Sequence, residues 1–257
     1  MRASVHICSR NRHCELAIML HSLLRQTERE WDLLIVDDAS GTPIQSAKYV
    51  QDVLTEIKMD GHDVFIIRNE VSYGVCRARQ CAIDGDPWKD NGIVVRLDDD
   101  VVLEPDFLEC LMEIAETGKI GTGVTPVFGQ PHFERDSAHL NGTVNRIEFD
   151  AEGNIVKYAD DCGTAFLNTN TLPAHQFRSM AAFPRKVFDD VKYEEGLSPV
   201  GFREEAFLSL RAAWAGWNME CNLRATAWHA PCNTGGCRSS PAEYQGWVTD
   251  DDAKFRK

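Results

Sequence analysis

The sequence lacks any concentration of positive charge. Lys and Arg total 27 against 40 Asp and Glu, which gives a formal net charge of -13, and no Lys/Arg-rich block stands out. Non-specific binding to nucleic acid and attraction to an anionic membrane surface both depend on summed positive charge. We therefore expect no non-specific nucleic-acid binding.

Long apolar runs are missing as well. The sequence starts directly with a short apolar strand near Ser4 and lacks the apolar core of a signal peptide. No later run reaches the roughly 20 residues that span a bilayer. The nine cysteines are odd in number and scattered, which fits reduced thiols better than a disulfide framework. These absences predict a cytoplasmic protein with no transmembrane segment.

Two common phosphate-binding loops are also absent. The first predicted strand is followed by Ser9-Arg10-Asn11-Arg12, which contains no glycine, whereas a dinucleotide oxidoreductase needs a glycine-rich turn at this place. No Gly-Lys-Ser/Thr sequence follows any strand, so a P-loop is excluded. If a phosphorylated nucleotide binds, its phosphates must be held by a metal and by basic side chains.

What the first half does contain is a regular alternation of strands and helices. With 257 residues and 43 % hydrophobic content, the chain can bury the core of one large domain or of two closely joined halves. Apolar patterns predict strands at 4–8, 31–36, 64–67 and 93–97, separated by helices at 16–24, 43–57 and 75–83. This order predicts a mostly parallel sheet whose ligands bind beyond the carboxyl ends of the strands.

Three consecutive carboxylates, Asp98, Asp99 and Asp100, end the last of these strands. Like charges so close together repel unless a cation or a donor network neutralises them, so the triplet indicates a metal site. The alternative is an acidic turn that caps a helix beginning at Pro105. Because Asp38 ends another strand at the same edge of the sheet, independent caps are the less favoured interpretation.

The second half is less regular. A strand is predicted at 121–127, a hairpin at 144–149 and 154–158, and a further strand from Met219 to Trp228 that ends at His229. Two glycines and the acidic residues 250–252 suggest a mobile C-terminal tail that closes over bound ligand.

Several of these segments, in this order, resemble the family-2 glycosyltransferases of the GT-A fold. They are residues 4–26 with the Ser-Arg-Asn-Arg turn, residues 34–40, Asn69 with Gly74 and Arg79, and residues 97–105 around the triplet. Soluble members of this family transfer a sugar from a nucleotide-sugar with inversion at the anomeric carbon. No Gln-x-x-Arg-Trp motif and no membrane helix is present, so single rather than processive transfer is expected.

The resemblance implies a Rossmann-like α/β fold of the GT-A type, built as a single domain over residues 1–257. Its mostly parallel sheet is flanked by helices and is joined to a smaller mixed half. We expect residues 1–125 to bind the nucleotide-sugar, residues 126–230 to face the acceptor, and residues 231–257 to form the mobile tail.

The resemblance also assigns roles to single residues. Asp38 contacts the nucleobase, Asp98 the ribose hydroxyls, and Asp100 the Mn²⁺ or Mg²⁺ ion. An ionised carboxylate only accepts hydrogen bonds, which suits a base N–H or a ribose diol. Arg79 matches a family arginine near the nucleotide, although it could be an exposed helix residue. The predicted nucleotide site is completed by Ser9, Arg10 and Asp99.

A later segment, residues 201–217, resembles the family's Glu-Asp catalytic motif at the start of a helix. Alignment through Arg211 and Gly216 places Glu205 where the family carries its catalytic aspartate, so Glu205 is the predicted general base. The alternative is that Glu204 and Glu205 only complement the positive N-terminus of the helix.

His229 falls where many family members place a histidine on the metal, although a lone histidine is more often structural. With Cys221, Cys232 and Cys237 it also allows a zinc site, but the spacing fits no tight zinc pattern.

The predicted function is metal-dependent transfer of a sugar from a nucleotide-diphosphate-sugar donor to a hydroxyl of a glycan, a lipid-linked sugar or a small molecule. Two alternatives remain open at this point. One is a sugar nucleotidyltransferase on a related fold, and the other is a nucleotide- or sugar-binding module without catalysis.

Overall fold

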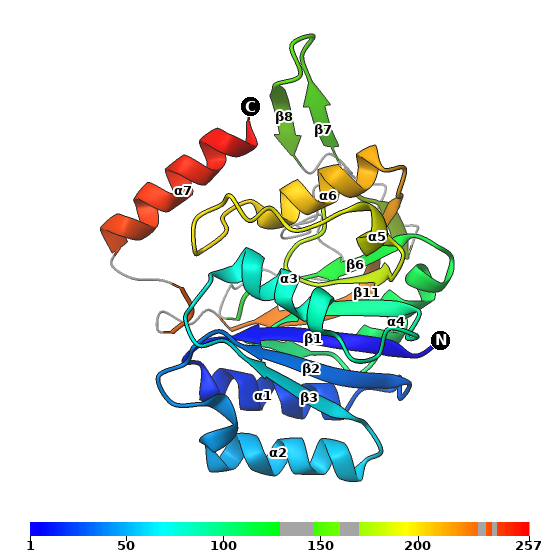
Figure 1. The fold of residues 1–257 in the computed structure, drawn as a ribbon. Coiled ribbons are helices and arrows are strands. Elements are labelled where there is room, and N and C mark those ends of the chain that lie inside the picture. Colours follow the sequence, from blue (N-terminus) through cyan, green and yellow to red (C-terminus); the bar gives the residue numbers. More distant parts are fainter. Residues whose placement is uncertain (129–145, 160–169, 231–234, 238–240, 257) are drawn as a thin grey trace.

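The computed structural model describes residues 1–128, 146–159, 170–230, 235–237 and 241–256. A nine-stranded sheet with helices on its faces forms the body of the protein, and a separate two-stranded hairpin projects from it (Figure 1). The first half consists of β1 (Ala3–Ser9), α1 (His13–Leu24), β2 (Trp31–Asp37), the 3₁₀ turn η1 (Ile44–Ser46), α2 (Lys48–Met59), β3 (Val64–Arg68), α3 (Val75–Gly85) and β4 (Ile93–Asp98).

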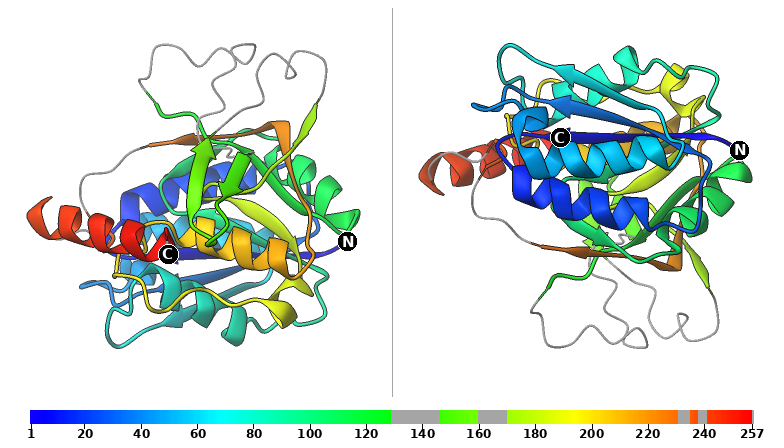
Figure 2. Two further views of the ribbon diagram at one scale, coloured as in Figure 1. Left: turned by 90° about the horizontal axis from the view of Figure 1, so that it is seen from above. Right: turned by 90° about the horizontal axis from the view of Figure 1, so that it is seen from below.

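The four strands of this half are parallel and lie in the order β3-β2-β1-β4. Their register aligns Ser9 of β1 with Asp37 of β2, and Cys8 with Asp98 of β4. The carboxyl ends therefore meet at one edge, as the sequence predicts, and the turns after β1, β2 and β4 lie side by side. Helices α1 and α2 cover one face of the sheet and α3 the other (Figures 1 and 2).

The second half is mixed. It consists of β5 (Val101–Leu103), α4 (Phe107–Glu116), β6 (Ile120–Val124), β7 (Arg146–Phe149), β8 (Ile155–Ala159), β9 (Thr171–Pro173), β10 (Ala181–Pro184), α5 (Val187–Asp190), α6 (Glu204–Trp214), β11 (Met219–His229) and α7 (Pro241–Phe255). Strand β10 runs antiparallel between β4 and β6, and β11 pairs with β6, β5 and β9. The predicted α/β fold with a mixed second half is confirmed, and β7 with β8 is the predicted hairpin.

Several boundaries differ from the sequence prediction; the helix expected at 16–24, for example, begins at His13. The helix expected from Pro105 begins at Phe107, because residues 104–107 form a turn in which the Phe107 amide donates to the Glu104 carbonyl at 3.1 Å. The helix expected from Pro43 begins at Lys48, because Ala47 is extended after η1. The strand expected at 121–127 ends at Val124.

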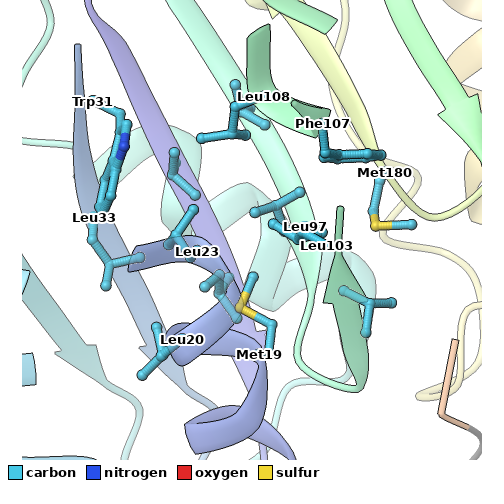
Figure 3. Packing of buried hydrophobic residues seen from close by; sticks show 14 of the residues in the cluster. Met19, Leu20, Leu23, Trp31, Leu33, Leu97, Leu103, Phe107, Leu108 and Met180 are labelled. Carbon is cyan, nitrogen blue, oxygen red and sulfur yellow. The ribbon is translucent and has the colours of Figure 1, made fainter. Parts of the chain in front are cut away.

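The main core lies between the sheet and the helices of one face. Figure 3 shows α1 side chains Met19, Leu20 and Leu23 packed beneath the sheet, next to Trp31 and Leu97 of the strands. All five are fully buried, and burying a side chain of this size contributes about 1.5–3 kcal/mol. The core gives the strand ends, and the turns after them, a rigid base.

The segment predicted as a mobile tail contains a helix of 15 residues, α7, which the sequence analysis did not predict. Phe255 near its end is buried against Tyr158 of β8 and Phe207 of α6. The last turn of α7 therefore lies beside the beginning of α6 (Figure 2). In the described part of the chain, no helix is long and apolar enough to cross a membrane.

Candidate active site

All nine residues predicted for the site line one cavity of about 270 Å³. It opens at the carboxyl ends of β1, β2 and β4, with α6 and β11 closing its other sides. The residues are Ser9, Arg10, Asp38, Arg79, Asp98, Asp99, Asp100, Glu205 and His229. The sequence thus identified residues that share one cavity, although they come from six separate segments of the chain.

An arginine of the chain lies against the carboxylate triplet. Nη1 of Arg12 donates to Asp99 Oδ1 at 2.9 Å and to Asp100 Oδ2 at 2.7 Å. Both aspartates are buried, and loss of solvation raises the pKa of Asp99 to about 6 although the nearby Arg12 guanidinium opposes that rise. Arg12 is therefore a counter-ion that already offsets part of the repulsion within the triplet.

Arg79 fixes the first member of the triplet. Its guanidinium donates to the carbonyl oxygen of Leu97 at 2.9 Å and also binds the Asp98 carboxylate. Arg79 is only 4 % exposed, so the interpretation of this residue as an exposed helix residue is wrong. Asp98 keeps 25 % of its side chain exposed and faces the cavity.

Asp38 is hydrogen-bonded on both oxygens. Oδ1 accepts from Asn69 Nδ2 at 2.8 Å and from the Tyr73 amide at 3.0 Å, while Oδ2 accepts from Ser72 Oγ at 2.7 Å and from the Gly74 amide at 3.1 Å. A carboxylate has about four lone-pair sites. All the acceptor sites of the Asp38 carboxylate are therefore used by donors of the loop at 69–74.

The turn after β1 connects the cavity to the C-terminal part of the chain. The Arg10 carbonyl accepts from the Gly236 amide at 2.8 Å, and Arg10 Nη1 donates to the Gly236 carbonyl at 3.1 Å. The Ser9 carbonyl accepts from the Asp38 amide at 3.0 Å, which ties the same turn to the end of β2. Gly236 and Cys237 form part of the cavity wall.

The two glutamates that begin α6 have different environments. Glu204 is buried and binds both terminal nitrogens of Arg96, which projects from β4; one of these bonds measures 2.7 Å. Glu205 Oε1 is 3.7 Å from Arg96 Nη2 and keeps 23 % of its side chain exposed. Burial, followed by repulsion from Glu204, raises the pKa of Glu205 to about 7. A pKa in this range suits the general base that the sequence predicts at Glu205, whereas Glu204 is the ion-pair partner of Arg96.

The proposed metal ligands lie close together. His229, at the end of β11, places Nε2 3.5 Å from Asp100 Oδ2. No group of three or more His, Cys, Asp or Glu side chains suited to a metal occurs within the described residues. Carboxylate oxygen suits both Mn²⁺ and Mg²⁺, and Mg²⁺ is commonly held by one or two carboxylates plus substrate phosphates. A neutral imidazole is a common metal ligand and can add to such a set. The donor set fits a cation that is shared with a diphosphate.

The zinc alternative finds no support among the described residues. Cys221 is buried within β11, Cys237 lines the cavity, and Cys232 lies outside the described residues.

Sequence reasoning missed Arg12 and Arg96, two buried arginines of the cavity. A signal existed for Arg96, because a charge inside an apolar parallel strand requires a buried partner. The signal for Arg12 was weaker. It is the second arginine of the turn after β1, and the neighbouring strand β4 ends in the carboxylates that it binds.

The sequence profile of "Glycosyl transferase family 2" matches residues 4–192. This match ends before Glu205 and His229, so it carries no information on either residue. Among curated proteins, none matches the sequence.

Two solved structures show the same fold. "GalNAc-T7 with UDP, GalNAc and Mn2+" superimposes with a TM-score of 0.69 at 18 % identity, over 94 % of this chain and 46 % of that chain. "S. aureus TarS 1-349 in complex with UDP-GlcNAc" gives 0.63 at 12 % identity, over 99 % and 66 % respectively. The present chain thus spans less than two thirds of the length of either protein. Because the family profile covers well over half of the chain and the fold agrees, the protein belongs to glycosyl transferase family 2.

Proposed function

We propose that the protein transfers a sugar from a nucleotide-diphosphate-sugar to an acceptor hydroxyl, with inversion at the anomeric carbon. The observation that carries the proposal is that Glu205, with its pKa raised to about 7, lines the same cavity as Asp38 and the carboxylate triplet. Membership of the family supports the reaction class. The ligands named for the two similar structures, UDP and UDP-GlcNAc, support a uridine nucleotide as the first donor to test.

The donor nucleotide is proposed to lie along the carboxyl ends of β1, β2 and β4. Asp98, held by Arg79 and open to the cavity, is positioned to accept from the ribose hydroxyls. Asp38 is the proposed base contact. Since its four acceptor sites are in use, binding a base N–H requires that one of the present donors be shared or released.

Asp100 and His229 are the proposed ligands of a divalent cation, Mn²⁺ or Mg²⁺. When bound, such an ion would supply electrostatic stabilisation of the negative charge on the leaving diphosphate. Because Arg12 Nη1 donates to Asp100 Oδ2 at 2.7 Å, the ion would have to share this carboxylate with Arg12 or displace the guanidinium.

Glu205 is the proposed proton acceptor. The acceptor oxygen forms a bond to the anomeric carbon from the face opposite the nucleotide, while its proton passes to the Glu205 carboxylate. The bond between the anomeric carbon and the phosphate oxygen breaks, and the nucleoside diphosphate leaves with the electron pair. A base is most effective when its pKa is near the working pH, and the pKa of about 7 suits the Glu205 carboxyl to this role near neutral pH.

A panel of nucleotide-sugars, assayed with Mn²⁺, Mg²⁺ or EDTA and with candidate acceptors, tests the proposal. We expect release of nucleoside diphosphate and a product of inverted configuration by NMR, only when a divalent cation is present. A product of retained configuration would contradict the proposed mechanism. Equal nucleotide affinity with a divalent cation and in EDTA would contradict the proposed metal site. Release of pyrophosphate would identify a nucleotidyltransferase, and binding without turnover a binding module.

A further inference from the structure

Helix α7 carries a fully buried carboxylate that the proposed reaction does not use. Asp251 has no exposed surface, and its Oδ1 accepts from the Ser198 amide at 2.9 Å. Its Oδ2 accepts from Ser198 Oγ at 2.5 Å and from the Phe202 amide at 3.1 Å. On the next turn of α7, Lys254 lies 3.6 Å from Asp251 Oδ1 and donates to the Gly196 carbonyl at 2.8 Å. One side of α7 thus holds the loop at 196–202.

This loop is a wall of the candidate active site. Pro199, Val200 and Gly201 line the cavity. The Pro199 carbonyl accepts from the Val75 amide at 3.0 Å, and a Cβ on Gly74 would lie 2.7 Å from Pro199 Cα, so the loop is pressed against the start of α3. Three residues after Phe202, the chain reaches Glu205, so any shift of the loop is passed to the start of α6.

The residue between the loop and the two glutamates is held in an unfavourable conformation. Arg203 has φ 71°, in the left-handed region that residues with a Cβ rarely adopt. Its Nε donates to Asp252 Oδ1 at 2.9 Å, and its guanidinium lies over the rings of Phe202 at 4.7 Å and Phe255 at 5.8 Å. Because Asp252 and Phe255 belong to α7, this helix holds the entry to α6 at a second point.

We propose that Asp251 is a positioning residue for Glu205: by fixing the 196–202 loop, it sets the start of α6 and the direction in which Glu205 enters the cavity. The inference rests on the proposed function of Glu205 as general base. No residue of α7 is among the described residues that line the cavity, so α7 acts through the loop and not by touching a substrate.

Asp251→Asn tests the inference, with Asp250→Asn as its matched control. The amide keeps the shape of the side chain but turns an NH₂ group toward backbone or hydroxyl donors. Asp250 is the exposed neighbour on the same helix, so its replacement removes the same charge without touching the loop. We expect Asp251→Asn to lower kcat by about 10 to 10²-fold, because a misplacement near 1 Å can cost about 10²-fold, with donor affinity unchanged.

Two readouts separate positioning from loss of fold. In the pH profile of kcat, the fall in kcat at acid pH reports protonation of Glu205. We expect this fall to shift along the pH axis in Asp251→Asn, because Glu205 changes its distance from the charged groups around it, Glu204, Arg96 and Asp98. Hydrogen exchange of the amides in the 196–205 segment is expected to become faster in the same variant. Ser198→Ala, which removes one hydroxyl and leaves the carboxylate, provides a milder version if Asp251→Asn does not fold.

The inference is overturned if folded Asp251→Asn keeps the wild-type kcat and pH profile, or if Asp250→Asn causes the same loss. Failure of the proposed function gives a different pattern, since wild-type protein then transfers no sugar. In that case the hydrogen-exchange measurement still decides whether Asp251 holds the 196–202 loop. Unchanged exchange in both Asp251→Asn and Ser198→Ala would refute this role of Asp251.

Discussion

The Arg96 guanidinium binds Glu204 through both terminal nitrogens, whereas Oε1 of the adjacent Glu205 lies 3.7 Å from Arg96 Nη2. One buried cation therefore neutralises one of two neighbouring carboxylates. The second carboxylate loses solvation, faces the charge of Glu204, and has a pKa of about 7. Two residues of the same type thus acquire different chemistry from a single arginine on β4.

The first prediction is that Glu205→Gln lowers kcat by about 10² to 10⁴-fold, the usual contribution of a positioned base, and leaves donor affinity within a few-fold. Steady-state kinetics and calorimetry with the donor nucleotide measure the two quantities. Glu205→Asp shortens the reach by one methylene, so we expect partial activity.

Glu204→Gln is the matched control for Glu205→Gln. It leaves the buried Arg96 charge without its carboxylate, which typically costs about 3–5 kcal/mol in free energy of unfolding. Chemical denaturation measures this loss. If folded Glu204→Gln abolishes transfer while Glu205→Gln stays active, the assignment of the base is wrong by one residue.

The second prediction concerns the pH dependence of kcat. Glu205 must be ionised to accept a proton, and its pKa is raised to about 7. Below that pH, kcat is expected to fall about tenfold per pH unit. This fall in kcat below about pH 7 should be absent from any residual activity of Glu205→Gln. A flat profile between pH 5 and 7 in wild-type protein would contradict the role of Glu205.

The third prediction is that Glu205→Gln stabilises the fold at alkaline pH. A raised carboxyl pKa contributes stability below the unfolded value of about 4.3, and that contribution is lost as pH rises through about 7. At pH 8 the free energy of unfolding of the variant should therefore exceed that of the wild type by roughly 1 to 3 kcal/mol. This difference should vanish near pH 4. Denaturant titrations at both pH values measure it; a difference independent of pH would count against the raised pKa.

The parallel half of the fold was predictable because its strands are short apolar runs that alternate with helices. Its site residues followed from the same pattern, since the turns after parallel strands meet at one edge. Asp38 and Asp98 could therefore be placed together before any contact was known. Their roles in binding remain predictions.

The parts that the sequence did not predict depend on contacts between distant segments. Arg96 and Glu204 are 108 positions apart, and nothing local indicates that they meet. Strand β5 has three residues and exists through its pairing with β11. Helix α7 has only a weak apolar pattern in its sequence, and Asp251 within its acidic run is buried because the 196–202 loop supplies donors.

The fourth prediction is that Arg12→Gln makes stability depend on a divalent cation. Asp99 and Asp100 are buried, and the variant removes the guanidinium that binds both. We expect a lower Tm without metal and a larger rise on adding Mn²⁺ than in the wild type, because ligands that bind the folded state stabilise it. Arg10→Gln is the control, since Arg10 binds the Gly236 carbonyl. Equal Mn²⁺ shifts in both variants would contradict the role of Arg12.

The fifth prediction separates two ways in which Asp38 can support nucleotide binding. Asp38→Asn replaces one acceptor oxygen with an NH₂ group that faces the donors of the loop at 69–74. If Asp38 also contacts the base, UDP should lose about tenfold or more in affinity, equivalent to about 1.4 kcal/mol, while ribose 5-diphosphate loses less. Calorimetry with the two ligands at fixed Mn²⁺ gives the comparison.

Asp37→Asn is the control for Asp38→Asn, because Asp37 is a buried neighbour that accepts from the Ser40 amide at 2.9 Å and does not line the cavity. Its effect should appear in Tm and leave the ratio of the two affinities unchanged. Equal losses for both ligands in Asp38→Asn would mean that Asp38 acts through the loop alone. Unchanged UDP affinity would contradict any contact between Asp38 and the nucleotide. Asp98, which Arg79 holds in place, would then be the remaining proposed contact to the nucleotide at this edge of the sheet.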